Sequence, residues 1–270
     1  MTIHPEPLSM EGNGAADELF KLSIDHLTLA RMDSTLVRMP KLVHIQTARI
    51  GQALASPVRL RALNLLAQRP WPVGEIAAEL GESMASASAH LRSLREACLV
   101  VHQRQGRRVM YRIAGSEAIR LLAAVNRAAS ALLPEMREVV REAMSDPTRM
   151  QPTDPKVLAA QVEAGEVHLV DLRPIDEYEA GRLPGARSVP LRGLDAIDLS
   201  ELPSDGSVLA YGRGPWCVIA RQGVMAVNER GVPARLLPLG VVEWRAAGLE
   251  LEHHGAGGCS ASVAEESDGH

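Results

Sequence analysis

Apolar positions in the first half of the chain recur at the spacing of helices. One predicted helix ends near Leu54, Ser56-Pro57 interrupts the pattern, and a second helix is expected to follow. Residues 74–80 are expected to form one compact helix, and Gly81-Glu82 is expected to turn the chain into a further helix with Ser83 as its N-cap. Two short helices joined by a tight glycine turn are typical of a helix-turn-helix.

The helix after Ser83 is expected to have one apolar face and one slim outer face. The apolar stripe is Met84, Ala87, Leu91 and Leu94. The residues that point away from it are small apart from one arginine: Ala85, Ser86, Ser88, Ala89 and Arg92. Such a face lets a helix enter a groove, because nothing bulky holds its backbone off. Beyond it, alternating apolar positions at 109, 111 and 113 predict two short strands joined by a turn at 104–107.

Residues 116–144 carry a longer helical pattern with a seven-residue repeat. The repeat predicts a seam between two chains that involves Ile119, Leu122, Asn126, Leu133, Met136 and Val140. An apolar face packed within one chain gives the same pattern. Pro134 is expected to bend this helix or split it in two.

The second half of the chain has a different period. After a proline-containing stretch at 146–156, short apolar runs at 167–172, 188–191, 207–211 and 234–239 alternate with helical segments at 175–180, 218–230 and 241–247. This alternation predicts an α/β domain with a parallel sheet that helices cover on both faces.

Charge is sorted along the chain. Residues 83–112 hold six arginines against Glu96 alone, which gives this stretch +5 (6 minus 1). The whole chain has 29 Lys+Arg and 33 Asp+Glu, so the remainder sums to −9 (23 minus 32). A slim helix beside a cationic hairpin suits duplex DNA, with the helix at base edges and the hairpin tip at phosphates. A solvated charged surface is the alternative explanation of the arginines.

Composition narrows the function further. Aromatic residues are 3% of the chain, which argues against stacking platforms for single-stranded nucleic acid. Apolar runs stay short of a membrane span, so we expect a cytoplasmic protein that does not enter a membrane. The three cysteines, Cys98, Cys217 and Cys259, are far apart, so neither a disulfide framework nor a metal site is expected, and no cofactor is expected either. His253-His254 is interpreted as part of a solvated tail.

The stretch from Ala53 to Ala114 resembles the ArsR/SmtB-type winged helix-turn-helix transcriptional regulators. The residues that carry the resemblance are Ala55-Ser56-Pro57-x-Arg59, Val73-Gly74-Glu75-Ile76-Ala77, Ser88-x-His90-Leu91 and Gly106-Arg107-Arg108-Val109-x-Tyr111. The resemblance implies a dimer that binds palindromic double-stranded DNA, commonly as a repressor. The expected DNA-binding residues are Ser83, Ala85, Ser86, Ser88, Ala89, His90, Arg92, Arg104, Gln105, Arg107 and Arg108.

This chain departs from that family in three places. Met84 and Ala89 stand where polar base readers are common, so the operator sequence does not carry over. Pro72 stands where metal-sensing members have cysteine, which argues against metal sensing. Cys98 stands where glycine is usual after the recognition helix. We expect Cys98 to be a small buried thiol, and a redox switch at Cys98 is the alternative.

Residues from about Val157 to Glu252 resemble a rhodanese-type domain. The matching residues are Asp171-Leu172-Arg173, Glu177-Tyr178, 181–186, the loop 212–217, Gly240 and Glu243-Trp244-Arg245. In that family the loop wraps a cysteine persulfide with backbone N–H groups, and the following helix points its N-terminus at the charge. Asp171 and Arg173 are expected to brace strand ends and not to act as an acid/base pair.

The first position of that loop is Gly212, which cannot carry sulfur. The chain is therefore not expected to be an ordinary sulfurtransferase. Cys217 is the remaining thiol of the loop, and the start of the helix together with Arg213 is expected to lower its pKa. Fused regulators of this kind commonly have cysteine at both positions. We expect Cys217 to pack as a small hydrophobe beneath Trp216, and a reactive thiol is the alternative.

The expected architecture has two domains: a mainly α winged helix-turn-helix followed by an α/β rhodanese-like domain. The chain is expected to divide into six segments. These are a partly disordered N-terminal extension at 1–43, the DNA-binding domain at 44–115, a dimerisation helix at 116–145, a linker at 146–156, the rhodanese-like domain at 157–254 and a disordered tail at 255–270. The expected function is a repressor whose second domain senses or scaffolds a small sulfur or oxidant effector. The alternative is a sulfurtransferase that uses Cys217 as its persulfide carrier.

Overall fold

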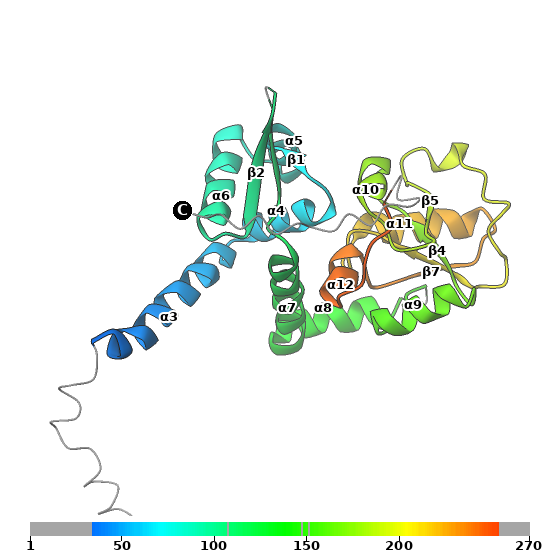
Figure 1. Cartoon of the computed structure of the whole chain (residues 1–270). Coiled ribbons are helices and arrows are strands. Elements are labelled where there is room, and N and C mark those ends of the chain that lie inside the picture. The colour runs from blue at the N-terminus through cyan, green and yellow to red at the C-terminus, as the bar shows by residue number, and fades with distance from the viewer. Residues whose placement is uncertain (1–33, 107, 147, 151, 254–270) are drawn as a thin grey trace, which may run out of the picture. The chain divides into compact units, whose positions relative to one another are not determined.

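The computed structural model describes residues 34–106, 108–146, 148–150 and 152–253 (Figure 1). Most of the predicted N-terminal extension, and the predicted tail, therefore lie outside the described residues. The first described element is the helix α3, Ser34–Leu54. It exposes about half of the side chains of Met39, Leu42 and Val43.

The N-terminal domain begins with the helix α4, Pro57–Gln68, which restarts the chain after α3 as predicted. Ser56 is its N-cap, and Pro57 occupies the first turn, where a missing N–H costs nothing. The short strand β1, Trp71–Pro72, leads into the helix α5, Val73–Leu80, and then into the helix α6, Met84–Glu96. Gly81 ends α5 with φ of 69°, the left-handed conformation that glycine adopts without strain. The helix-turn-helix is thereby formed by α5 and α6.

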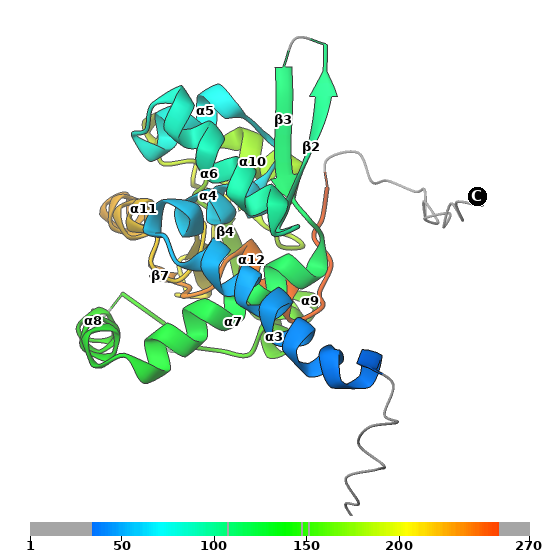
Figure 2. The same cartoon turned by 90° about the vertical axis from the view of Figure 1, so that its left-hand side faces the viewer.

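A three-stranded antiparallel sheet completes this domain, in the order β1-β3-β2. The strands β2, Val100–Gln105, and β3, Arg108–Ile113, form the predicted hairpin, with Gln105 opposite Arg108 at its tip. Both views show the hairpin extending beyond α5 and α6 (Figures 1 and 2). Buried side chains from the helices and from the base of the hairpin form the core, among them Leu63, Ile76, Leu91 and Ile113.

The predicted long helix is divided into α7, Ser116–Leu132, and α8, Pro134–Met144. Pro134 lies in the first turn of α8, which confirms the predicted break. The predicted seam is wrong for Ile119 and Leu122, because both are fully buried within their own chain where α7 packs against α4 and α12. Asn126, Met136 and Val140 are half-buried, and Leu133 is 50% exposed.

The C-terminal domain contains a four-stranded parallel sheet in the order β5-β4-β6-β7. Its strands are β4, His168–Asp171; β5, Arg187–Ser188; β6, Val208–Tyr211; and β7, Ala234–Leu236. Its helices are α9, Pro155–Glu163; α10, Ile175–Ala180; the short 3-10 helix η1, Leu194–Ala196; α11, Val218–Glu229; and α12, Val241–Ala246. The predicted alternation of strands and helices, and with it the α/β fold class, is confirmed.

Two apolar cores lie on opposite faces of this sheet. One face packs against α11, through residues that include Val170, Ala210 and Val224. The other packs against α9 and α12, through Leu158, Tyr211 and Trp244 among others. Successive strand residues point to opposite faces, so Ala210 and Tyr211 belong to different cores.

The beginning of this domain was only partly predicted. Residues 148–150, in the expected linker, pair with the edge strand β7 through Leu236 N–H to Thr148 O at 2.7 Å and Met150 N–H to Leu236 O at 2.9 Å. The helix α9 begins at Pro155, with Asp154 as its N-cap, and was not predicted. Strand β5 is Arg187–Ser188 instead of 188–191, because only two residues pair there with β4.

Candidate functional site

The inner face of α6 fixes the direction of its outer face. Ala87, Leu91 and Leu94 are fully buried in the core of the N-terminal domain. Ser83 is the N-cap as predicted, and its Oγ accepts a hydrogen bond from Ser86 N at 3.1 Å. Because one stripe of α6 is held inward and its start is capped, the small residues of the opposite side face outward.

The predicted outward residues lie at the surface of the domain. Ser83, Ala85, Ala89 and Arg92 are exposed, and Ser86, Ser88 and His90 are half-buried. Met84 was expected in the apolar stripe, but it is 53% exposed, so that expectation is wrong. It occupies the first position of the helix, beyond the core, and its sulfur lies 3.7 Å from where a Cβ on Gly74 would be. Met84 therefore belongs to the outward surface of α6, which the sequence pattern did not predict.

The hairpin tip carries the remaining predicted DNA contacts. Residues 101–106 and Arg108 are exposed. Arg104 Nε donates to Gly106 O at 3.2 Å, and the rings of His102 and Tyr111 stack with centroids 5.6 Å apart. The placement of Arg107 lies outside the described residues. The hairpin thus presents Arg104, Gln105 and Arg108 as a solvent-exposed cationic tip.

Cys98 is exposed, so the expectation of a buried thiol is wrong. It has φ of 58° and follows the end of α6, where its N–H reaches Arg95 O at 2.9 Å and Leu99 N–H reaches Leu94 O at 2.9 Å. This left-handed turn directs the chain from the helix into β2 and leaves the side chain of residue 98 in solvent. The same geometry explains why glycine suits this position.

The loop 212–217 joins the carboxyl end of β6 to the start of α11. Cys217 is the N-cap residue of α11, is half-buried, and packs as a small hydrophobe against the core on the α11 face. A Cβ placed on Gly212 would lie 2.7 Å from Cys217 Sγ and 2.8 Å from the Cβ of Ala220. The sulfur of Cys217 therefore occupies the space into which a side chain at position 212 would point.

The helix α12 begins directly beneath this loop. A Cβ on Gly240 would lie 2.8 Å from both Gly212 O and Gly214 N, so only glycine fits between the two segments. Gly240 N–H donates to Glu243 Oε2 at 3.0 Å. Burial raises the pKa of Glu243 from 4.5 to about 7.

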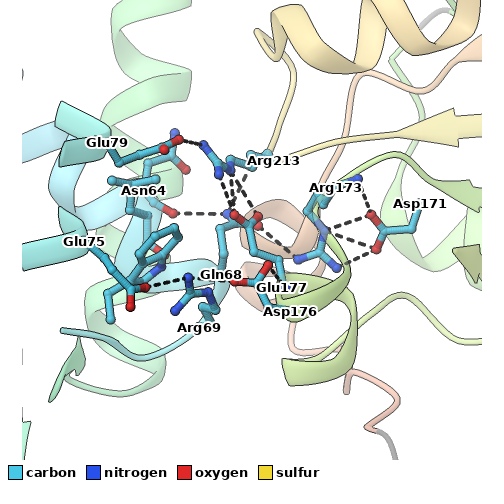
Figure 3. Close-up of polar contacts among 12 residues, drawn as sticks. Asn64, Gln68, Arg69, Glu75, Glu79, Asp171, Arg173, Asp176, Glu177 and Arg213 are labelled. Atoms are coloured by element: carbon cyan, nitrogen blue, oxygen red, sulfur yellow. Dashed lines mark hydrogen bonds and ion pairs between the residues drawn. The ribbon is translucent and has the colours of Figure 1, made fainter. Parts of the chain in front are cut away.

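Arg213 points its guanidinium at two carboxylates (Figure 3). Its Nη2 and Nε donate to Glu177 Oε1 at 2.5 and 2.9 Å, and Nη1 donates to Glu79 Oε1 at 2.7 Å. Burial alone would lower the pKa of Arg213, but the two carboxylates outweigh it and raise this pKa. Burial also raises the pKa of Glu177, and the hydrogen bonds from Arg213 offset part of that effect. Arg213 was expected to supply positive charge to Cys217; it instead balances two acids.

Asp171 and Arg173 form a fully buried ion pair with Nη2 and Oδ2 2.6 Å apart. Tyr211 OH donates to the same Asp171 oxygen at 2.6 Å, and Arg173 Nη2 donates to Gly181 O at 2.7 Å. Burial and the Asp171 charge raise the pKa of Tyr211. Asp171 and Tyr211 are the last residues of β4 and β6, as expected for a bracing role, and Gly181 is the C-cap of α10.

Three further residues link this network to the N-terminal domain. Gln68, at the end of α4, accepts from Arg173 Nη1 at 3.1 Å, and its amide donates to Arg213 O at 3.4 Å. Arg69 pairs with Asp176 at 2.7 Å, and Arg245 Nη1 donates to Ala67 O at 3.3 Å. No local motif marks Gln68 or Glu79, because their partners are more than a hundred residues away along the chain. Sequence reasoning therefore missed them.

A cavity of about 640 Å³ lies beside Cys217. Arg149 lines it, with its guanidinium carbon 5.2 Å from the centre of the Trp216 ring and its Nη2 donating to Pro215 O at 2.7 Å. Burial lowers the pKa of Arg149. The cavity is lined by Val139, Glu142, Ala143, Ser145, Asp146, Arg149, Pro215, Trp216, Cys217, Val218, Arg221 and Leu236. A small molecule therefore has space next to the thiol.

Within the described ranges, no group of three or more His, Cys, Asp or Glu side chains is placed to hold a metal ion. None of the helices that the structure describes combines the length and the apolar character needed to cross a membrane. His253 is exposed, and its Nδ1 lies 2.8 Å from Ala180 O. His254 lies outside the described residues.

The fold and the site define a class: a winged helix-turn-helix domain of ArsR/SmtB type joined to a rhodanese-like domain. Family models match on both counts, a helix-turn-helix domain at residues 54–103 and a rhodanese-like domain at residues 154–247. The chain is 40% identical to the HTH-type transcriptional regulator Rv0324 of Mycobacterium tuberculosis, over 77% of this chain and 90% of that protein. The chain therefore belongs to the family of HTH-type transcriptional regulators that includes Rv0324.

Other similarities cover the N-terminal domain. The HTH-type transcriptional regulator CmtR of Mycobacterium tuberculosis is 43% identical over 28% of this chain and 64% of its own length. Among solved structures, the homodimeric winged helix-turn-helix DNA-binding domain Mb0332 of Mycobacterium bovis is 41% identical, with a TM-score of 0.34, over 35% of this chain and 88% of that one.

Proposed function

We propose that this transcriptional regulator is a repressor that binds palindromic double-stranded DNA as a homodimer. The observation that carries the proposal is the exposed, slim outer face of α6 beside an exposed cationic hairpin. A helix of that shape enters the major groove, and arginines at the hairpin tip contact phosphates. A two-fold dimer presents two such helices to two half-sites of a palindrome.

The C-terminal domain acts in this proposal as a sensor or scaffold for a small sulfur or oxidant effector. Gly212 stands at the position where rhodanese-type domains carry the nucleophile, which argues against sustained sulfur transfer. Cys217 keeps a thiol at the start of α11, next to a cavity of about 640 Å³. A modified or occupied loop shifts DNA binding only as far as the effector prefers one state of the protein over the other.

The test of DNA binding is an electrophoretic shift of a fragment from upstream of the protein's own gene. We expect a shift by the wild type and a large loss when Arg104, Arg107 and Arg108 are all changed to Ala. The slope of log affinity against log salt should fall by about three, roughly one for each phosphate contact removed. The control changes two exposed arginines of the C-terminal domain, Arg192 and Arg235, to Ala. Equal affinity of the wild type and the triple variant contradicts the proposed interface.

The test of sensing treats the protein with polysulfide and measures the modification by mass spectrometry together with the operator affinity. We expect added sulfur on Cys217 and a changed affinity, with both effects absent in Cys217→Ser. Cys98→Ser is the matched control, because Cys98 is an exposed thiol far from the loop in sequence. Modification of Cys217 with unchanged affinity contradicts the sensor role.

A sulfurtransferase that uses Cys217 is the second candidate. The favouring observation is that Cys217 Sγ lies only 2.7 Å from the Cβ position of residue 212, within the loop that carries sulfur in rhodanese-type domains. Thiosulfate:cyanide turnover by the wild type, lost in Cys217→Ser, is the result that would favour this candidate. Absence of turnover at every substrate concentration eliminates it.

A further inference from the structure

The loop 212–217 contacts the N-terminal domain with both its backbone and a side chain. Arg213 O accepts from the amide of Gln68 at the end of α4, and the Arg213 guanidinium pairs with Glu79 on α5 (Figure 3). Cys217 is in the same loop, four residues later, and its N–H donates to Gly214 O at 3.2 Å. One short segment therefore connects the thiol to the first two helices of the DNA-binding domain.

Gln68 forms the contact between the N-terminal domain and the backbone of the loop, through the hydrogen bond from its amide to Arg213 O. It is 4% exposed, so its amide and carbonyl groups have little access to water. Its amide donates to Asn64 O at 3.1 Å and to Arg213 O at 3.4 Å, while its carbonyl accepts from Arg173. A buried polar group that loses its partners is costly, so movement of Arg213 O is opposed by the end of α4.

Glu79 makes the side-chain part of the connection. It lies on the helix that comes directly before α6, whose outer face is the proposed DNA-binding surface. It is on α5, which packs against α6 and is joined to it through the turn at Gly81. The Arg213 charge that holds it is itself fixed by Glu177, whose side chain is fully buried. The arginine that holds the loop to Glu177 is therefore also in contact with α5, and α5 packs against α6.

We propose that Arg213 is a positioning residue that transmits the state of the 212–217 loop to α6 through Glu79 and Gln68. The inference rests on the proposed function, because it names the route by which the sensor loop acts on DNA binding. A group added to Cys217 Sγ enters the neighbouring cavity, which Pro215 and Trp216 of the same loop also line, so it presses on the loop itself. The loop accommodates the added group by moving, and Arg213 moves with it.

The experiment uses the full chain with Cys98 and Cys259 changed to Ser, so that iodoacetamide alkylates Cys217 alone. Operator dissociation constants are measured before and after alkylation. We expect alkylation to weaken operator binding by roughly fivefold, at the lower end of measured coupling between sites. In the same background, the Glu79→Gln and Gln68→Ala double variant should bind the operator equally well before and after alkylation.

Asp176→Asn is the matched control, because it breaks the Arg69–Asp176 pair between the same two domains without touching the loop. The Asp176→Asn variant should keep the full effect of alkylation on operator binding. If the double variant lost that effect only because its two domains separate, Asp176→Asn should lose it as well. Glu79→Gln alone provides a second variant; Glu79 is 41% exposed, so its change leaves the fold intact. The inference is overturned if alkylation leaves operator binding unchanged in the parent, or if its effect survives in the double variant. Absence of binding by the unalkylated parent instead refutes the proposed function.

Discussion

At the scale of single residues, the loop region balances nearly every charge it buries. Asp171 has Arg173, Glu177 has Arg213, and Arg213 also has Glu79. Glu243 differs, because its partner is a backbone N–H, that of Gly240, and not a cation. Burial without a cation opposes ionisation, which is why the pKa of Glu243 rises to about 7.

This raised pKa predicts a pH dependence of stability. The unfolded chain ionises Glu243 near its ordinary pKa of 4.5, while the folded chain holds the proton up to about pH 7. The free energy of unfolding therefore falls as pH rises from about 4.5 to 7 and levels off above, by up to about 3 kcal/mol. Glu243→Gln keeps a carbonyl for Gly240 N–H and should remove this fall. Urea unfolding at pH 5 and pH 7.5 measures it.

The control for this measurement is Glu250→Gln, a residue of the same segment. A wild-type free energy of unfolding that is the same at both pH values, or a fall that persists in Glu243→Gln, contradicts the assignment.

At the scale of elements, capping and turn residues predicted most of the N-terminal domain. Ser56-Pro57, Gly81 and Ser83 mark where helices start or end, and each effect is local, so the sequence alone reveals it. The helix α9 escaped prediction because its prolines were interpreted as a linker, although Pro155 lies in the first turn after the N-cap Asp154. Cys98 was misplaced because its exposure follows from a left-handed turn that no cysteine pattern signals.

The turn of the helix-turn-helix gives a prediction at this scale. Gly81→Ala forces an L side chain into a conformation with φ of 69°, and we expect a loss of about 1 kcal/mol in the free energy of unfolding. Gly51→Ala is the opposite case, because Gly51 lies within α3 and a Cβ there meets nothing within 4 Å. It should be neutral or stabilising by up to about 1 kcal/mol. Thermal unfolding of both variants measures the contrast, and equal effects would refute the role of the turn.

At the scale of the whole molecule, the sequence predicted which two domains are joined but not how they are connected. Gln68 and Glu79 gain their roles from partners in the other domain. A single chain gives no pattern for such distant pairs. The seven-residue repeat likewise did not distinguish a surface between chains from a core within one, and Ile119 and Leu122 belong to the core.

The proposed dimer gives the prediction at this scale. Leu133 is 50% exposed at the break between α7 and α8, so it remains available to a second chain. Leu133→Glu removes two apolar contacts from a two-fold interface, which should weaken dimerisation by roughly two to four orders of magnitude. Sedimentation velocity should show a dimer for the wild type and a monomer for the variant. Val157→Glu, at an equally exposed position on α9, should remain dimeric. A dimeric Leu133→Glu variant contradicts the seam.

The crowded space at Gly212 has a consequence for any attempt to introduce a thiol at this position. A cysteine introduced there would bring its Cβ to 3.1 Å from Cys217 Cβ, which is closer than the Cβ atoms of a relaxed disulfide, and to 2.7 Å from Cys217 Sγ, which is inside van der Waals contact. The two sulfur atoms would therefore lie in contact with each other within the loop. A Gly212→Cys variant therefore requires Cys217 to shift and places two thiols in one loop, whereas Gly212→Cys combined with Cys217→Ala leaves a single thiol at the start of the loop.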